Sequence, residues 1–291
     1  LSRVSVWVPG QSRMTSKFDK SLILRSFEHG VLRGGVHLFE TIDSTNSWVL
    51  AEIGNGRDQP FVCLADHQTK GRGRRGRHWL SPPGANIYLT LAWRFELPPH
   101  ELGLLALAQG VAVLNALKRI GIADAWLKWP NDVLVAKDKI AGVLIETRGV
   151  SAAACNAAIG IGLNYHMPET IVADSSLDWT DIVGVLEQPI PDRNLVAAML
   201  LHEMVGMCRR YQQKAMAIYS ELESDLVGLN GRQVAVRREN LDETTGIVLG
   251  IAQTGELRLL VEGKELRFNS ADVSLTAAKN ASAPGAEHAD H

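Results

Sequence analysis

The run KGRGRRGRHW at positions 70–79 is the densest group of residues in this sequence that could do chemistry. Five of its first eight residues are lysine or arginine, and glycines separate them. Guanidinium groups bind oxyanions through paired N–H donors, and glycine lets the backbone approach the same anion. The run therefore predicts a site for phosphate or carboxylate groups. On composition alone an exposed loop or a nucleic-acid-binding patch has about equal weight, although the run lacks the G-K-[ST] of a P-loop and the interleaved aromatic residues of a single-strand groove.

A second group of polar residues interrupts the apolar segment LKWPNDVLVAKDKIAGVLIE at positions 127–146. Asn131 and Asp132 belong to it, and a Pro-Asn-Asp hairpin turn would explain both without any ligand. Two of its cations are Lys128 and Lys139. Lys139 opens an otherwise apolar strand, and burying a lysine is costly unless the lysine is paired. Its position therefore indicates a ligand or a partner carboxylate.

Two shorter motifs carry weaker signals. The tripeptide STN at 44–46 could be no more than a helix cap. The segment GIGLN at 160–164 places two glycines and an asparagine in an apolar strand, where glycine usually marks the close approach of a ligand or of another backbone. Neither motif identifies a site by itself.

The elements that must position these residues alternate between helical and strand patterns. Apolar periodicity predicts helices over 18–32, after a cap at Asp43 or Ser44, and over 98–121 and 192–224. Leu22, Leu24 and Phe27 form the expected buried stripe of the first helix. Apolar runs predict strands over 4–10, 61–66, 86–93, 139–147 and 157–165, and then over 232–239, 245–263 and 264–275. The last three strands indicate a small all-β unit, plausibly a barrel.

The composition is that of an ordinary globular protein. The 291 residues predict about two domains, and a hydrophobic fraction of 46% is enough for a sizeable core. The formal net charge of −2 argues against a dedicated nucleic-acid-binding domain, though not against a local basic patch. Three cysteines, far apart in the chain, exclude a disulfide-stapled scaffold and a close Cys–Cys metal site. The most apolar stretch, 102–117, is shorter than the roughly 20 residues of a membrane-spanning helix, and no signal-peptide pattern is visible. We therefore expect a cytoplasmic protein that does not contact membranes.

Four segments together resemble the biotin–protein ligases, also called biotin–[acetyl-CoA-carboxylase] ligases. They occur in that family's order and at its spacing: IDSTNSWVL, ADHQTKGRGRRGRHWLSPPGANIYLTLAW, LKWPNDVLVAKDKIAGVLIE and IGIGLNY. The blocks GRGRRG and KWPND are highly specific in combination, whereas STN alone is not. The resemblance extends from about residue 36 to 275. It implies an α+β fold, in which a catalytic domain like that of class II aminoacyl-tRNA synthetases precedes a small SH3-like β-barrel.

The resemblance also implies a division of the chain. The expected parts are an N-terminal segment at 1–35, a catalytic domain at 36–224, an SH3-like domain at 225–276 and a disordered tail at 277–291. VSVWVPGQSR resembles the last wing strand of the winged-helix domain in repressor-type members, and a linker helix would follow it. The helices that would read DNA are absent from these residues, so DNA binding is not expected of this chain. Thr69-Lys70 also departs from many relatives, which carry uncharged residues there.

The activity implied by the resemblance has two half-reactions. The carboxylate of biotin attacks the α-phosphorus of Mg-ATP, which gives biotinyl-5′-AMP and pyrophosphate. A lysine amine of a biotin carboxyl carrier protein, an acetyl-CoA carboxylase subunit, then attacks the mixed anhydride and releases AMP. Adenylation brings two anions together, so it needs cations that neutralise their repulsion. No nucleophilic side chain is needed, and the cysteines and histidines are interpreted as bystanders.

The residue roles follow from the resemblance and from the chemistry of each side chain. Those expected to take part in catalysis are Arg72, Lys128, Asp132 and Lys139, of which Asp132 could also bind Mg²⁺. The expected biotin contacts are Ser44, Thr45, Asn46, Gln68, Gly71, Arg72, Gly73, Arg74, Lys139 and Gly142. The expected nucleotide contacts are Arg72, Arg74, Trp79, Asn131 and Asn164, with Trp79 stacked on adenine. No permanently bound metal is expected.

Two other functions stay open. A lipoate–protein ligase would share the fold and the class of chemistry, but its pocket would hold a dithiolane instead of a ureido ring. A nucleic-acid-binding protein would use the arginine-rich loop on phosphate backbones. A homodimer is also possible.

Overall fold

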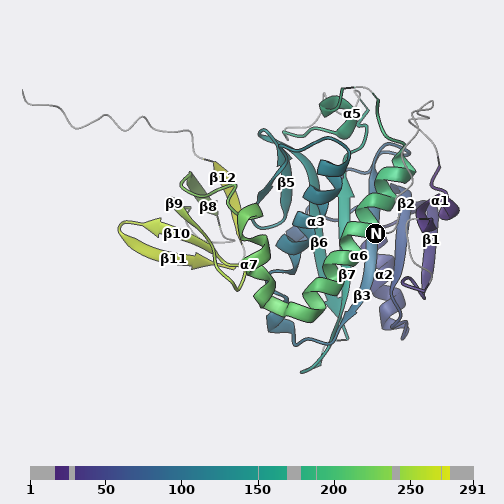
Figure 1. Ribbon diagram of the computed structural model, residues 1–291, viewed down its shortest axis with the longest axis horizontal. Helices are drawn as coiled ribbons and strands as arrows, with labels where there is room; N and C mark the ends of the chain where they lie inside the picture. The colour runs from purple at the N-terminus through teal and green to yellow at the C-terminus, as the bar shows by residue number, and fades with distance from the viewer. Residues whose placement is uncertain are drawn as a thin grey trace, which may run out of the picture.

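A mixed seven-stranded sheet forms the centre of the larger domain in a computed structural model, which describes residues 17–25, 30–149, 151–168, 178–187, 189–237, 243–269 and 271–275 (Figure 1). The strand order is β1-β2-β3-β7-β6-β5-β4, and only the edge pair β1–β2 is parallel. The strands are β1 (Gly35–Ile42), β2 (Phe61–Gln68), β3 (Ile87–Phe95), β4 (Trp126–Lys128), β5 (Asp132–Val135), β6 (Asp138–Arg148) and β7 (Cys155–Leu163).

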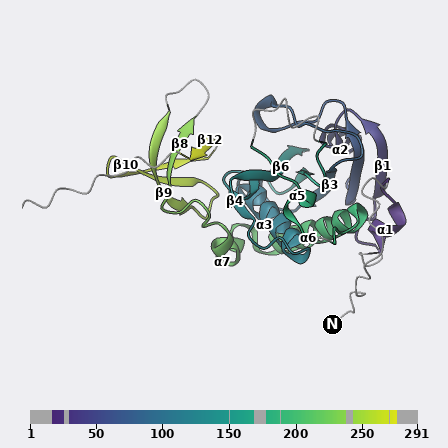
Figure 2. The same ribbon diagram turned by 90° about the horizontal axis from the view of Figure 1, so that it is seen from above.

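Helices cover both faces of this sheet, which is why its central strands are continuous apolar runs (Figure 2). On one face, α3 (Leu105–Arg119) and α6 (Arg193–Lys214) pack against the sheet and against each other. On the opposite face lies α2 (Thr45–Gly54), which packs Val49 and Ile53 onto β2, β3 and β7. The second face is only partly covered by α2, and the uncovered part carries the site described below.

The segment Pro99–Arg119 is long and apolar enough to pass for a membrane span, with a mean hydropathy of 1.3. It is a core helix instead, since 61% of that segment is buried within the protein. It consists of the short turn η2 (Pro99–Leu102) followed by α3. The predicted helix at 98–121 is therefore confirmed, with its end at Gly121, whose φ of 103° suits glycine.

Helix caps foreseen from the sequence are also present. Ser44 caps α2, where its side chain accepts a hydrogen bond from the backbone N–H of Ser47 at 3.4 Å. Asp192 caps α6 and accepts from the backbone N–H of Asn194 at 2.8 Å. Each cap satisfies one of the backbone donors that the first turn of a helix leaves unpaired.

The predicted helix at 18–32 is wrong in extent. The structure has a five-residue helix, α1 (Lys20–Leu24), and residues 30–34 are turns and bends. Its buried residue is Ile23, whereas Leu22 and Leu24 are 40% and 36% exposed. A single turn of helix can bury only one position, so the expected stripe does not form. Phe27 and the strand expected at 4–10 lie outside the described residues.

Other corrections concern boundaries. The predicted helix at 192–224 breaks at Ala215, a non-glycine residue with φ of 47°, and continues as short turns: η3 (Ala215–Ile218), α7 (Tyr219–Leu222) and η4 (Glu223–Asp225). The edge strand β1 was not predicted. Val36 is its only buried residue, so the strand shows no alternation of buried and exposed side chains. A further short helix is α5 (Ile182–Val185).

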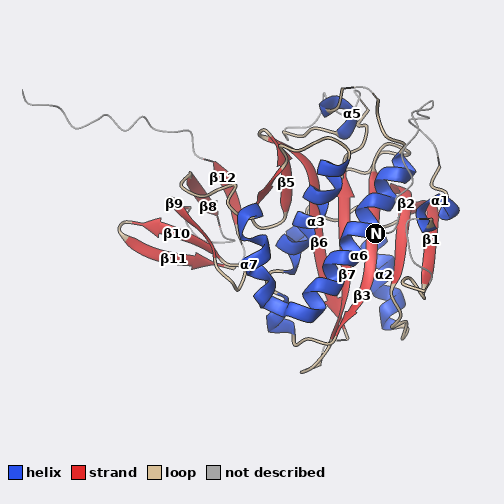
Figure 3. Cartoon of the chain, viewed as in Figure 1, coloured by secondary structure: helices blue, strands red, loops and turns tan. Residues whose placement is uncertain are grey.

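The last part of the described chain forms a five-stranded antiparallel sheet of order β11-β10-β9-β8-β12 (Figure 3). Its strands are β8 (Gln233–Arg237), β9 (Thr244–Ile251), β10 (Leu257–Val261), β11 (Lys264–Phe268) and β12 (Asp272–Leu275). The small all-β unit is thus confirmed, although 245–263 and 264–275 each contain two strands. The turns at Gly255 and Gly263, with φ of 89° and 77°, allow the tight reversals.

The second sheet is anchored to the first domain by its β9–β10 turn. Trp129 Nε1 donates to the carbonyl of Gly255 at 2.9 Å, and the hydroxyl of Tyr219 donates to the carbonyl of Ile251 at 2.8 Å. A Cβ on Gly103 would stand 2.4 Å from the carbonyl oxygen of Thr254, so glycine permits the two backbones to meet. The second sheet is therefore packed against the start of α3.

Candidate functional site

A cavity of about 470 Å³ opens on the face of the sheet that α2 covers only in part. Directly opposed residues on neighbouring strands share one face of a sheet. One such row crosses five strands and lines the cavity: Lys128, Asp132, Gly142, Gly162 and Tyr88. Leu144 and Gly160 of the next row also line the cavity, and Thr90 stands opposite Gly160 in that row. Alternate glycines of β7 therefore form a floor without side chains.

The structure brings nearly all of the sequence-predicted residues to this one cavity. Its lining includes Ser44, Thr45, Asn46, Gln68, Arg72, Gly73, Arg74, Trp79, Lys128, Asn131, Asp132, Lys139, Gly142 and Asn164. Gly71 is the predicted site residue that does not line it. A Cβ on Gly71 would stand 2.4 Å from the carbonyl oxygen of Trp79, so this glycine lets the loop close on itself.

Neutral polar side chains occupy the end of the cavity nearest α2. Thr45 donates its backbone N–H and its hydroxyl to Gln68 Oε1 at 2.9 and 3.1 Å. The hydroxyl of Thr90 contacts Asn46 Oδ1 at 2.7 Å and Thr45 Oγ1 at 2.8 Å. All four side chains are buried and held by these bonds. A rigid, uncharged and polar wall of this kind suits a neutral ligand group that must be oriented.

Two glycines of the floor make room for site side chains rather than for backbone. A Cβ on Gly160 would stand 2.0 Å from Asn46 Oδ1, and a Cβ on Gly162 would stand 2.4 Å from the indole of Trp79. A Cβ on Gly142 would also reach that indole, at 3.0 Å. The close approach expected from GIGLN is therefore real, and the approaching groups are Asn46 and Trp79.

The indole of Trp79 lies across the floor of the cavity, with Lys139 Nζ 5.0 Å from its ring centre. Its Nε1–H is buried and has no hydrogen-bond partner in the described part of the chain. An unpaired buried donor costs free energy, and native proteins rarely keep one without a reason. A ligand acceptor, or a move of the indole when a ligand enters, would satisfy this donor.

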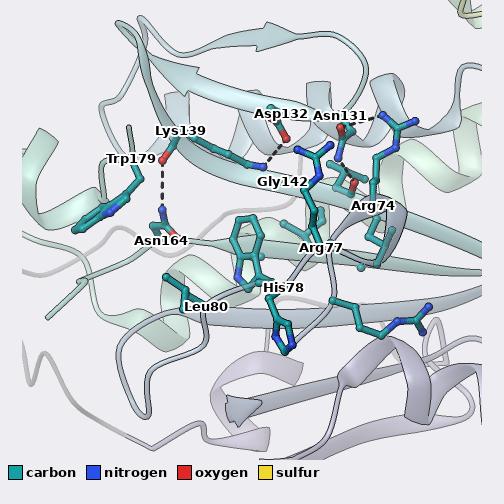
Figure 4. Close-up of a pocket in the computed structure, with 18 of the residues that line it drawn as sticks. Arg74, Arg77, His78, Leu80, Asn131, Asp132, Lys139, Gly142, Asn164 and Trp179 are labelled. Carbon is teal, nitrogen blue, oxygen red and sulfur yellow. Dashed lines mark hydrogen bonds and ion pairs between the residues drawn. The ribbon is translucent and has the colours of Figure 1, made fainter. Parts of the chain in front are cut away.

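Two of the cavity's cations are held by Asn131 and Asp132, which lie just before and at the start of β5 (Figure 4). Lys139 Nζ forms an ion pair with Asp132 Oδ1 at 2.6 Å. Arg74 donates to Asn131 Oδ1 at 3.3 Å, and Asn131 Nδ2 donates in turn to the carbonyl of Val143 at 2.8 Å. These contacts join the arginine-rich loop and the start of β6 to one hairpin.

Asp132 is the residue of this cavity that we expected to bind Mg²⁺. No group of three or more His, Cys, Asp or Glu side chains that could hold a metal ion occurs among the described residues. Asp132 can supply one oxygen ligand, and Mg²⁺ typically combines one or two carboxylates with substrate phosphates and water. The site therefore fits a magnesium ion that arrives with a nucleotide.

The cysteines do not belong to the cavity. Cys63, Cys155 and Cys208 are all buried, and burial raises the pKa of each thiol above its ordinary value. A protonated thiol is a poor nucleophile. Their interpretation as bystanders agrees with this environment.

Both parts of the molecule match known families. Residues 38–164 match the Biotin/lipoate A/B protein ligase family, and residues 230–276 match the Biotin protein ligase C terminal domain. The chain is 34% identical over 252 residues to the bifunctional ligase/repressor BirA of Escherichia coli, covering 86% of this chain and 77% of that protein. It belongs to the biotin protein ligase family.

Other members of this family are similar over comparable lengths. The biotin--[acetyl-CoA-carboxylase] ligase of Mycobacterium tuberculosis is 34% identical over 238 residues, covering 79% of this chain and 85% of that one. A biotin protein ligase of Aquifex aeolicus, solved in complex with biotin and ATP, has a TM-score of 0.66 at 27% identity, covering 84% of this chain and 99% of that one. The α+β catalytic fold followed by a small β domain is thus confirmed.

Several residues of this ligase's cavity were not foreseen from the sequence. The lining also includes Arg77, His78, Leu80, Tyr88, Lys137, Met167, Asp178 and Trp179. Tyr88 stands opposite Gly162 on the neighbouring strand, a pairing that the sequence by itself does not show. Trp179 comes from a distant segment and reaches the cavity through a bridge to Lys139, for which the sequence gives no signal.

The arginine-rich loop is folded as a narrow turn in this ligase. Arg72 and His78 form an isolated bridge, and the backbone N–H of Gly73 donates to the carbonyl of Arg77 at 2.7 Å. Arg75, at the tip, has φ of 56°, a left-handed conformation that is rare for a residue with a side chain. The loop is thus a strained turn that carries several mutually repelling cations.

We predict that residues 66–78 open readily without ligand and become ordered when biotin and ATP bind, because bound anions neutralise the repulsion. Limited trypsin digestion, which cuts after arginine, should then nick this loop several-fold more slowly with both ligands present. Trypsin also cuts after lysine, so cleavage at the exposed Lys264, the first residue of β11, serves as an internal control and should not change. Equal nicking of the loop with and without ligands would contradict the prediction. The second segment expected to behave in this way, 168–181, lies mostly outside the described residues.

Proposed function

We propose that this ligase activates biotin with ATP as biotinyl-5′-AMP and transfers the biotinyl group to a lysine of a biotin carboxyl carrier protein. The observation that carries the proposal is the make-up of the cavity. A buried, neutral polar wall at Thr45, Asn46 and Gln68 stands in the same cavity as the cations Arg72 and Lys139. That combination suits a ligand with an uncharged polar head and a carboxylate tail.

In the first half-reaction, a carboxylate oxygen of biotin forms a bond to the α-phosphorus of ATP, and the bond to the departing pyrophosphate breaks. Both reactants are anions, so positive charge near the reacting atoms lowers the barrier. Arg72 and Lys139 are assigned to the carboxylate and the α-phosphate, with Arg74 as a further phosphate contact. Magnesium that arrives with ATP would supply additional positive charge, and Asp132 would hold it.

The nucleotide base is assigned to Trp79, Asn131 and Asn164. The indole of Trp79 offers a flat apolar face for adenine and an Nε1–H that lacks a partner among the described residues. Asn164 Nδ2 is held by the carbonyls of Lys139 and Thr180 at 3.3 and 3.0 Å, which leaves its Oδ1 as the acceptor for an adenine amino group. These contacts would orient the base without charge.

In the second half-reaction, the lysine amine of the carrier attacks the carbonyl carbon of biotinyl-AMP, and the bond to the AMP oxygen breaks. The amine must lose a proton before or during the attack. Asp132 is assigned to orienting that amine, and Lys128 to the charge that remains on AMP. Lys128 stands directly opposite Asp132 in the strand register.

Lipoate is the alternative substrate of the same family fold. A dithiolane ring makes no use of polar wall groups, and polar groups buried against it would pay a desolvation cost. The amide and hydroxyl side chains of Thr45, Asn46 and Gln68 therefore favour a ureido ring over a dithiolane.

The decisive assay is exchange of pyrophosphate into ATP, which follows the first half-reaction alone. We expect exchange that requires biotin and is absent with lipoate. Exchange with lipoate but not with biotin would favour a lipoate ligase. No exchange, together with DNA binding that weakens steeply with salt, would favour a nucleic-acid-binding protein.

The setting of the reaction is proposed from the sequence and from the names of the relatives. We take the carrier to be the biotin carboxyl carrier subunit of acetyl-CoA carboxylase, as the name of the Mycobacterium tuberculosis relative suggests. We place the ligase in the cytoplasm. A homodimer stays a prediction.

A further inference from the structure

Glu146 is a charged residue beside the cavity to which the sequence assigned no role. It lies on β6, four residues after Gly142 and on the same face of the strand, because side chains alternate along a strand. It is not among the residues that line the cavity, and its side chain is 24% exposed. Its side chain lies beside the first turn of α2, where it contacts Asn46.

The carboxylate of Glu146 contacts two residues of the proposed biotin site at once. Its Oε1 accepts from the guanidinium of Arg72 at 2.5 Å, and its Oε2 accepts from Asn46 Nδ2 at 3.1 Å. The other terminal nitrogen of Arg72 donates to Ser47 Oγ of α2 at 3.3 Å. Both terminal nitrogens of Arg72 are thus engaged by groups outside the cavity lining.

We propose that Glu146 determines how strongly this ligase discriminates a charged from an uncharged tail on its ligand. Its carboxylate is an internal competitor for Arg72, and a ligand carboxylate must draw the guanidinium away from it. An uncharged tail does not gain enough from Arg72 to displace Glu146. Glu146 therefore acts through Arg72 as a specificity-determining residue, and the inference rests on the proposed binding of biotin.

The physical basis is the bidentate geometry of a guanidinium. Arginine binds a carboxylate best through two parallel N–H bonds, and one pair of terminal nitrogens cannot serve Glu146, Ser47 and a substrate in that way together. The pair with Glu146 is half-exposed and therefore weak, with Arg72 43% exposed. Arg72 can leave a weak ion pair with Glu146 and bind the carboxylate of a substrate instead. It could not leave a deeply buried pair as easily.

The test compares the affinities for biotin and for biotinamide, which differ only in the charge of the tail, by titration calorimetry without ATP. In Glu146→Gln, the amide oxygen can still accept from Asn46, but the competing charge is gone. We expect the preference for biotin over biotinamide to rise about two- to fivefold, as suits a half-exposed ion pair. An unchanged or reduced preference would overturn the proposal, and a reduced one would mean that Glu146 orients Arg72 toward the ligand.

Two further variants separate this effect from a structural one. Glu203→Gln removes the carboxylate of a similar pair, in which Glu203 and Arg119 are 19% and 37% exposed and stand 2.8 Å apart, and it should leave the preference unchanged. Glu146→Ala also removes the acceptor of Asn46, so both ligands should bind less tightly while the preference still rises. A wild-type protein that binds neither ligand would refute the proposed function itself. Binding of biotin with no change of preference in Glu146→Gln would refute only the role of Glu146.

Discussion

Replacing Lys139 with alanine is expected to slow the formation of biotinyl-AMP by about 10²–10³-fold, the usual effect of removing one preorganised group at developing charge. Lys139 lies at the start of β6, with Nζ 2.6 Å from Asp132 and 5.0 Å from the ring centre of Trp79. The variant would lose a cation and would also leave the carboxylate of Asp132 unneutralised where phosphates must bind. Both changes increase the electrostatic repulsion that the biotin carboxylate and the α-phosphate of ATP must overcome.

The same substitution should change stability much less than rate. The side chains of Lys139 and Asp132 are 32% and 25% exposed, and partly exposed pairs of this kind contribute about 0–1 kcal/mol. Single-turnover formation of biotinyl-AMP and the urea midpoint of unfolding measure the two effects separately. Lys264→Ala, on β11 outside the cavity, controls for the loss of any lysine. Near-wild-type adenylation by Lys139→Ala would show that Lys139 does not take part in this half-reaction.

Arg74→Gly is expected to release the intermediate faster while it leaves adenylation largely intact. Arg74 attaches the arginine-rich loop to Asn131 through a 3.3 Å hydrogen bond, whereas Arg72 and Lys139 stay in place in this variant. Biotinyl-AMP is a reactive anhydride, and a closed loop is a general means of protecting such species from water and from unselected amines. A loop that has lost its attachment should open more often, and the free anhydride would label lysines of unrelated proteins several-fold more.

The measurement is biotin blotting of an unrelated lysine-rich protein incubated with biotin, Mg-ATP and each enzyme. Arg75→Gly is the matched control, because it removes the adjacent arginine of the same loop and places glycine where φ is 56°. It retains the bond between Arg74 and Asn131, so its bystander labelling should resemble that of the wild type. Equal labelling by all three enzymes at similar adenylation rates would show that Arg74 does not retain the intermediate.

The strand register fixes the positions of several site residues relative to one another. Lys128, Asp132 and Gly142 lie in a single row, so any shift of the β5–β6 hairpin moves the cation, the carboxylate and the floor together. The bulge between Val133 and Leu134 places Lys139 opposite Leu134, on the same face as Asp132. Substitutions that disturb this hairpin should therefore affect both half-reactions.

Much of the molecule could be predicted from the sequence because its signals are local. The continuous apolar runs of β2, β3, β6 and β7 indicate strands buried on both faces, and Ser44 and Asp192 mark the starts of α2 and α6. The clustering of cations in the arginine-rich run and in the KWPND block indicates an anion site, although either group alone could be an exposed loop or a turn. Such features can be identified in the sequence without knowing which strands are neighbours.

Only the tertiary structure decided which groups meet. Two contacts of the site join residues 57 and 98 positions apart in the chain, namely Arg74 with Asn131 and Asn46 with the carbonyl of Leu144. The glycines of β7 could be recognised as close contacts, but the approaching groups, Asn46 and Trp79, depend on how α2 and the loop fold over the sheet. Glu146 carried no signal, because its role arises from two hydrogen bonds made across elements that are far apart in the chain. Sequence specifies the types of side chain, whereas strand order and register specify their neighbours.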